Sequence, residues 1–148
     1  MLLRHLMKVI VISIFIVVAT KCPSYAQEHS IVKVPIEVDS LSDDSVGERL
    51  AFQLRERIRQ STGYSLTSAN EPHMVLVLRT MDRDCLGKNK STIYSIVWTF
   101  KKDSVIRFYV DSAIGLAGDD VIEKAAEGII ARTDSMMESA RKTENKNK

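Results

Sequence analysis

Hydrophobic and polar positions alternate in three segments in the middle of the chain, and this pattern predicts three consecutive strands. Side chains on a strand point alternately to the two faces of a sheet. The first two segments carry apolar residues on both faces, which is typical of strands covered on both sides. The third alternates more cleanly and predicts a half-exposed strand. The segments are MVLVLRTMD at 74–82, STIYSIVWTF at 91–100 and VIRFYVDSAIG at 105–115.

Short polar links join these strands, at 87–90 and at 101–104. Links of this kind favour antiparallel neighbours, so the three strands are expected to form an antiparallel meander. Strict alternation then divides the third strand between two faces. One face has Ile106, Phe108, Val110 and Ile114, and the other has Arg107, Tyr109 and Asp111.

A further strand at 31–39 and an amphipathic helix precede the meander. Pro35 cannot donate a hydrogen bond to a neighbouring strand, so this first strand is expected at or near a sheet edge, or bulged at Pro35. Ser45 and Glu48 form a capping box that predicts the helix start, and Gly63 predicts a left-handed C-cap. The apolar stripe of the helix consists of Val46, Leu50, Ala51, Leu54 and Ile58.

Gly47, in the first turn of this helix, has two explanations. Either the helix backbone approaches the sheet closely at this position, or the helix start binds an anion. Asp43, Asp44 and Glu48 surround this helix end and would repel an anion, which favours close packing.

A second helix is expected after the meander, capped by Asp119 or Asp120. Met136 and Met137 near its end either fill the core or form a binding edge. Residues 141–148 are charged and are predicted to be a disordered tail. The residues at helical spacing are Val121, Ile122, Ala125, Ile129, Thr133, Met136 and Ala140.

The resulting order, β-α-β-β-β-α, predicts an α/β two-layer sandwich of the α+β class: a mixed four-stranded sheet with two helices packed on one face. The opening strand–helix–strand unit is expected to be a right-handed crossover between parallel strands. Residues 64–72 form a weak extended segment, in which 64–67 is a candidate for a short additional strand. The doubly apolar strands imply that the second sheet face is partly covered, by residues 64–72 or by a partner molecule. An exposed face with large apolar side chains would mark an interaction site. The candidate interaction residues are Trp98, Phe108, Tyr109, Met136 and Met137.

Residues 1–26 have the features of a secretory signal peptide. Arg4 and Lys8 form a basic start, 9–19 is an apolar run, and Ser24-Tyr25-Ala26 is a small-x-small cleavage site. The sequence therefore predicts cleavage near Ala26, a periplasmic or secreted location, and a single domain at 27–140.

The two alternatives to a cleaved leader are a membrane anchor and lipidation at Cys22. A membrane anchor needs about 20 apolar residues, and this run is shorter. Lipidation at Cys22 needs a small residue before the cysteine, where this chain has Lys21. Both alternatives are disfavoured.

Removal of this segment changes the charge balance. The whole chain has 21 Lys+Arg and 19 Asp+Glu. Arg4, Lys8 and Lys21 leave with the leader, so 18 basic and 19 acidic residues remain. Since several of the remaining basic residues lie in the tail, the folded part is mildly acidic. No basic footprint for nucleic acid is left.

Cys85 is the single cysteine after the leader, so no intramolecular disulfide can form. It is a half-buried small residue, a free thiol available to a partner, or a metal ligand with Asp82 and Asp84. The last set is incomplete, and neither a metal nor a cofactor is expected. His73 is expected on the surface or in a turn. The sequence has no HExxH, GxSxG or glycine-rich phosphate loop, which argues against an enzyme.

Part of the chain resembles small envelope α/β domains such as the amino-terminal domain of TolB. The resemblance rests on the strand at 32–38, Asp44-Ser45-Val46-Gly47, the helix segment 53–63 and the strand at 74–78. It implies a non-enzymatic accessory or adaptor that binds another envelope protein without a cofactor. The alternative is an inhibitor or immunity protein of an exported enzyme or toxin, consistent with small size and acidic loops.

Overall fold

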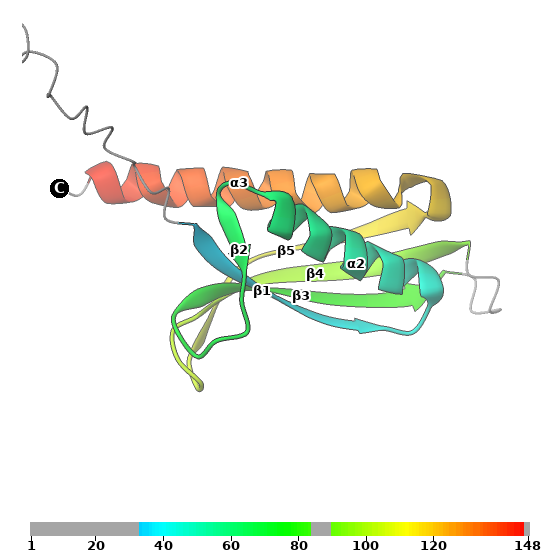
Figure 1. Ribbon diagram of the computed structural model, residues 1–148, viewed down its shortest axis with the longest axis horizontal. Helices are drawn as coiled ribbons and strands as arrows, with labels where there is room; N and C mark the ends of the chain where they lie inside the picture. Colours follow the sequence, from blue (N-terminus) through cyan, green and yellow to red (C-terminus); the bar gives the residue numbers. More distant parts are fainter. Residues whose placement is uncertain (1–32, 84–89, 147–148) are drawn as a thin grey trace, which may run out of the picture. The chain divides into compact units, whose positions relative to one another are not determined.

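The computed structural model describes residues 33–83 and 90–146, which form one continuous set of strands and helices (Figure 1). No helix in these two ranges is long and apolar enough to cross a membrane. In chain order the elements are β1 (Val34–Ser42), α2 (Ser45–Gln60), β2 (Tyr64–Leu66), β3 (His73–Asp82), β4 (Ser91–Lys101), β5 (Arg107–Gly118), the 3₁₀ turn η1 (Asp119–Val121) and α3 (Ile122–Lys146).

The sheet has five strands in the order β2-β1-β3-β4-β5, so the expectation of four strands is wrong by one. β1 is parallel to β3, and β3, β4 and β5 form the antiparallel meander that the short links predict. The additional strand, β2, pairs in parallel with the start of β1 and is only three residues long. It coincides with the candidate short strand at 64–67, which the predicted four-stranded sheet does not include because so short a segment shows too little alternation.

β1 lies next to the edge strand β2, so the prediction that Pro35 belongs to a strand at or near a sheet edge is confirmed in its second form. β1 lies between β2 and β3, because Val34 donates its amide hydrogen to Gly63 and Ile36 accepts one from Thr67. The backbone groups of alternate residues point to opposite neighbours, so Pro35 points towards β3. The pairing of β1 with β3 begins only at Ile36, one residue later. The missing amide hydrogen of Pro35 therefore breaks no ladder bond.

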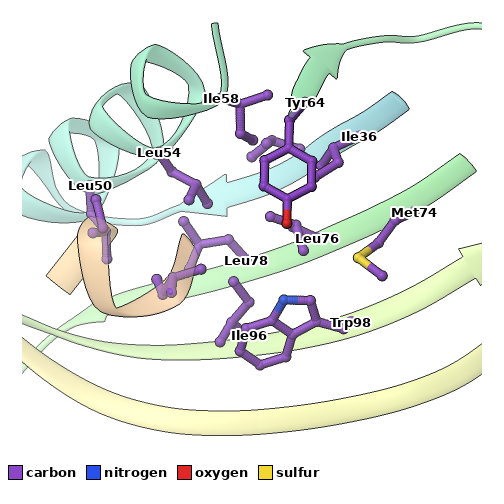
Figure 2. Close-up of a cluster of buried hydrophobic side chains, with 14 of the residues drawn as sticks. Ile36, Leu50, Leu54, Ile58, Tyr64, Met74, Leu76, Leu78, Ile96 and Trp98 are labelled. Atoms are coloured by element: carbon purple, nitrogen blue, oxygen red, sulfur yellow. The ribbon is translucent and has the colours of Figure 1, made fainter. Parts of the chain in front are cut away.

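Both helices pack on one face of the sheet, which is called here the covered face (Figure 1). Leu76 lies opposite Trp98 in the register, and Leu78 lies opposite Ile96. These four residues are fully buried, together with the predicted apolar stripe of α2. Figure 2 shows Leu50, Leu54 and Ile58 of α2 directed at the sheet residues. Full burial of one such side chain contributes roughly 1.5–3 kcal/mol, so this layer holds the fold together.

The helix ends differ from the predicted ones by small shifts. Asp44, and not Ser45, is the N-cap of α2, since its carboxylate accepts the amide hydrogen of Gly47 at 2.7 Å. At the other end Ser61 is the C-cap in an extended conformation, so Gly63 is not a left-handed cap. α3 continues to Lys146, so 141–146 are helical and the predicted tail is largely absent.

Gly47 packs directly against the sheet, as predicted. A Cβ at this position would overlap the side chain of Thr80 in β3. The carboxylate of Asp44 also accepts a hydrogen bond from the buried Thr92 hydroxyl at 2.8 Å. The first turn of α2 is therefore fixed to β3 and β4 by close contact and by one buried carboxylate.

A bulge in β5 changes the predicted division of its side chains. The register shifts between Trp98 and Thr99, so Val110 has no direct partner in β4. Before the bulge Phe108 lies opposite Phe100, on the side of the covered face. After it Ile114 lies opposite Ser95, on the other face. The one extra residue moves every later side chain of β5 to the opposite face of the sheet. A prediction based on a strict period of two cannot include such a shift.

Candidate interaction surface

The sheet face away from the helices, called here the open face, curls around its own middle. Arg107 of β5 approaches Asp39 of β1 to 3.9 Å, and Lys101 of β4 approaches Glu37 of β1 to 3.7 Å. Neighbouring strands are about 4.8 Å apart, so a flat sheet would keep β5 and β1 beyond the reach of one arginine. The Arg107–Asp39 pair, which spans two intervening strands, therefore indicates a curled sheet. Lys101 and Glu37, separated by one strand, extend the charged band across the open face.

The curl explains how apolar residues of the open face are buried without a second layer of helices. Val75 is fully buried on this face, and Val77 is half-buried. The connection at 67–72 leads from β2 past β1 to the start of β3. The expected cover of the second sheet face, by residues 64–72 or by a partner molecule, stays a prediction.

His73 is the first residue of β3 and is buried, so the expectation of a surface or turn histidine is wrong. Its Nδ1 lies 2.6 Å from the Glu71 carbonyl oxygen, and its Nε2 lies 2.7 Å from Glu37 Oε2. A carbonyl oxygen only accepts, so Nδ1 donates the first bond. The second bond needs another proton, on Nε2 or on the carboxylate. This polar cluster fixes the start of β3 to β1.

Large apolar side chains are exposed at the turn end of the β4–β5 hairpin, which projects away from the helices at the lower left of Figure 1. This group is called here the hairpin surface. Val105 is 87% exposed and Tyr109 is 67% exposed. Its members are Phe100, Val105, Ile106, Phe108, Tyr109 and Val110.

The hairpin turn itself is well ordered by hydrogen bonds. The Asp103 carboxylate accepts the amide hydrogens of Ile106 and Val105, both at 2.8 Å, and these bonds hold the pKa of Asp103 below its usual range. Lys102 donates its amide hydrogen to the Ile106 carbonyl. The apolar side chains next to the turn are thus presented on a defined backbone, which lowers the entropy lost when a partner binds.

Phe108 and Tyr109 lie in the hairpin surface, and Trp98 does not. Trp98 is fully buried under α3, where its indole donates to the Thr133 hydroxyl at 2.8 Å. Its assignment as an interaction residue is therefore wrong. The alternation of β4 placed it correctly on one face with Ile96, but that face is the one the helices cover.

The remaining candidates from the sequence are Met136, Met137 and Cys85. Met136 and Met137 are half-buried and pack against the core, which favours core filling over a binding edge. Cys85 lies outside the described residues. The sequence pattern does not single out Phe100, Val105, Ile106 and Val110 as interaction residues. A usable signal was the run 105–110, which carries one charge in six residues directly after a polar turn.

Arg132 of α3 links the helix layer to β5. It donates to Asp111 Oδ2 at 2.8 Å and to the Ser112 carbonyl at 3.2 Å. Its guanidinium carbon also lies 5.3 Å from the Trp98 ring centroid, within cation–π range. The Arg132 hydrogen bond is the main reason that the pKa of Asp111 is below its usual range.

A polar groove of about 440 Å³ lies between α2 and α3, with Arg57, Glu127 and Asp134 among its lining residues. Beside it the Tyr64 hydroxyl donates to Asp134. Burial, followed by this hydrogen bond, raises the pKa of Tyr64. The groove is open and mixed in charge. In the described ranges, no group of three or more His, Cys, Asp or Glu side chains is placed to hold a metal ion.

No protein-family model and no curated protein matches this chain. Two solved structures are similar in part. One is a minor lipoprotein from Acinetobacter baumannii, with 13% identity, a TM-score of 0.35, and coverage of 70% of this chain and 94% of that one. The other is the rare lipoprotein B from Shewanella oneidensis, with 16% identity, a TM-score of 0.35, and coverage of 71% and 98%. At such low TM-scores neither likeness supports a conclusion about this chain, and the resemblance to TolB stays a prediction.

Proposed function

We propose that this chain is an exported, non-enzymatic protein of the cell envelope that acts as an accessory or adaptor by binding another protein through its hairpin surface. The leader-like segment 1–26 supports export. The observation that carries the binding role is the hairpin surface itself, in which six large apolar side chains are exposed around the end of one ordered hairpin, on both of its faces. A concentration of exposed apolar side chains of this kind commonly marks a protein–protein interface.

Phe108 and Tyr109 are the expected anchors. Aromatic residues are enriched among the few interface positions that carry most of the binding free energy. The charged band next to the hairpin, with Arg107, Lys101 and Asp39, would form a polar rim around them. Since Phe108 and Tyr109 lie on opposite faces of the hairpin, the expected partner encloses the hairpin end in an apolar cleft with a polar margin.

The chain offers a matched control for this proposal. Phe52 on α2 is 56% exposed, and Phe108 is 52% exposed. Removal of either ring is expected to leave the fold intact, but only Phe108 belongs to the hairpin surface. We therefore compare Phe108→Ser with Phe52→Ser.

The experiment is a crosslinking capture of the exported chain from the envelope fraction, with the captured proteins identified by mass spectrometry. One recurring partner is expected with the wild type and with Phe52→Ser. With Phe108→Ser its yield should fall at least about tenfold, since an anchor residue typically contributes 2 kcal/mol or more. Equal capture by both variants, or no recurring partner at all, would contradict the proposal.

A further inference from the structure

The outer edge of β5 has backbone groups that no strand in the described ranges pairs with, since β5 is the last strand of the sheet. In an antiparallel ladder only alternate pairs exchange hydrogen bonds. Asp119 donates its amide hydrogen to the Lys90 carbonyl, so Lys90 and Asp119 form a hydrogen-bonded pair. The next hydrogen-bonded pairs along the ladder are therefore Thr92–Ala117 and Tyr94–Gly115. The residues between them, Leu116 and Ile114, therefore direct their N–H and C=O groups away from β4.

The neighbouring outward position, Ser112, is already protected. Its amide hydrogen is accepted by Asp111 Oδ1 at 2.8 Å, and its carbonyl accepts a hydrogen bond from Arg132. Together with the bulge at Val110, these bonds protect one end of the edge. The protection stops there, because Ala113 to Gly118 carries no charge and no proline.

The side chains of this stretch are as exposed as its backbone. Ile114 is 80% exposed and Leu116 is 51% exposed, both on the open face. An uncharged edge strand with exposed apolar side chains is a template for another strand.

A second observation concerns α3 above this edge. Gly128 is one turn before Arg132, so it lies on the side of α3 that faces the edge of β5. A Cβ at Gly128 would meet nothing within 4 Å, so no contact inside the chain requires a glycine. Glycine in a helix interior costs about 1 kcal/mol relative to alanine. Ser135 and Ser139 are small residues on the same side, and Arg132 between them and Gly128 is directed down to Asp111 of β5. This side is shaped for the close approach of another helix.

We propose that two copies of this chain associate through antiparallel pairing of β5 with β5, on a two-fold axis at Gly115. In this register Ile114 of each copy lies opposite Leu116 of the other, and their outward N–H and C=O groups pair. The exposed apolar side chains become neighbours on one continuous face. The two α3 helices then lie side by side with their Gly128 sides facing.

The charges at the ends of this ladder are compatible with the arrangement. Asp111 of one copy would lie opposite Asp119 of the other. Within each copy, however, Asp111 is already paired with Arg132 and Asp119 with Arg49. Each end therefore holds two ion pairs and not two free carboxylates. The interface is self-complementary, as a two-fold interface must be.

The first test is sedimentation of the purified exported chain over a range of concentrations. A reversible dimer is expected for the wild type. Ile114→Lys should raise its dissociation constant at least about tenfold, because it places a charge inside a closed ladder. Leu41→Lys is the matched control, since Leu41 is 62% exposed on the open face but lies in β1, away from the edge. A monomeric wild type, or a dimer unaffected by Ile114→Lys, would overturn the proposal.

The register has its own test in a Cys85→Ser background. Chains with Ile114→Cys and chains with Leu116→Cys are mixed and oxidised. Directly opposite residues of a hydrogen-bonded pair have Cα atoms about 5.5 Å apart, which suits a disulfide. The mixture should crosslink at least about tenfold faster than either chain alone, for which the equivalent cysteines are offset along the ladder. Equal rates would exclude this register.

Discussion

The two faces of the sheet are both apolar in sequence, but they are used in different ways. On the covered face Leu76, Ile96 and Trp98 are fully buried beneath two helices. On the open face Val75 in the middle of the sheet is buried, while Ile114 at the far edge stays exposed. A strand that is apolar on both faces therefore does not require a layer of helices on each side. A curled sheet buries the middle of its second face and leaves apolar residues exposed at the hairpin end and at the edge.

The largest expected difference between the two faces is in stability. Leu76→Ala on the covered face should lower the free energy of unfolding by about 2–5 kcal/mol, because a buried cavity remains. Leu41→Ala on the open face should change it by no more than about 0.5 kcal/mol, since Leu41 is largely exposed. Urea unfolding of both variants measures this contrast. Similar losses would show that the open face carries the fold as much as the covered face does.

A smaller difference in stability is expected between substitutions of the two helix glycines, Gly47 and Gly128. Gly47→Ala should destabilise the chain by roughly 1–3 kcal/mol, because its Cβ overlaps Thr80 and forces α2 away from the covered face. Gly128→Ala should stabilise the fold of each copy by about 1 kcal/mol, because its Cβ enters open space. Thermal melts at low protein concentration compare them. A stabilising Gly47→Ala would contradict the close contact between helix and sheet.

Removal of the N-cap of α2 is expected to cause a loss of stability of intermediate size. Asp44→Ala should cost about 1–2 kcal/mol, since it removes the acceptor of the Gly47 amide and of the Thr92 hydroxyl. Thr92→Val is the accompanying control, because it removes only the second of these bonds. Chemical denaturation measures both variants. If Thr92→Val costs as much as Asp44→Ala, the N-cap bond contributes nothing.

The smallest effect is a pH dependence at the edge of the sheet. The pKa of Asp111 is lowered in the folded chain, mainly by Arg132. Its stabilising contribution is therefore present above the unfolded pKa of about 3.9 and is lost as the pH falls through the lowered folded value. The difference in unfolding free energy between wild type and Asp111→Asn should be present at pH 6 and shrink towards pH 2. A difference that does not depend on pH would assign the effect to the hydrogen bonds alone.

Much of the fold could be predicted from alternation and helical spacing. The meander, the parallel β1–β3 pair and the buried stripe of α2 all follow from patterns several residues long. The features that were missed depend on single residues or short segments. The three-residue β2 is a candidate strand that the predicted sheet does not include, the bulge at Val110 adds one residue, and the N-cap moved by one position to Asp44.

The candidate surface was harder to predict, because periodicity assigns residues to a face without saying which face is covered. Trp98 and Phe108 lie on the same side of the sheet, but only Trp98 lies beneath α3. The length of the β4–β5 hairpin relative to the helices decides their exposure, and this is a tertiary property. The buried His73 has the same origin, since Glu37 reaches it only from the neighbouring strand β1, which is 36 residues away in the chain.

The central claim is that binding takes place at the hairpin end of the molecule and not on the helix layer. Site-specific photocrosslinking in the envelope tests it most directly, with the crosslinking residue placed either at Val105 on the hairpin surface or at Phe52 on α2. The account predicts a discrete adduct with one protein from position 105 and none from position 52. An adduct from position 52 with none from position 105 would contradict the claim and move the binding surface to the helices.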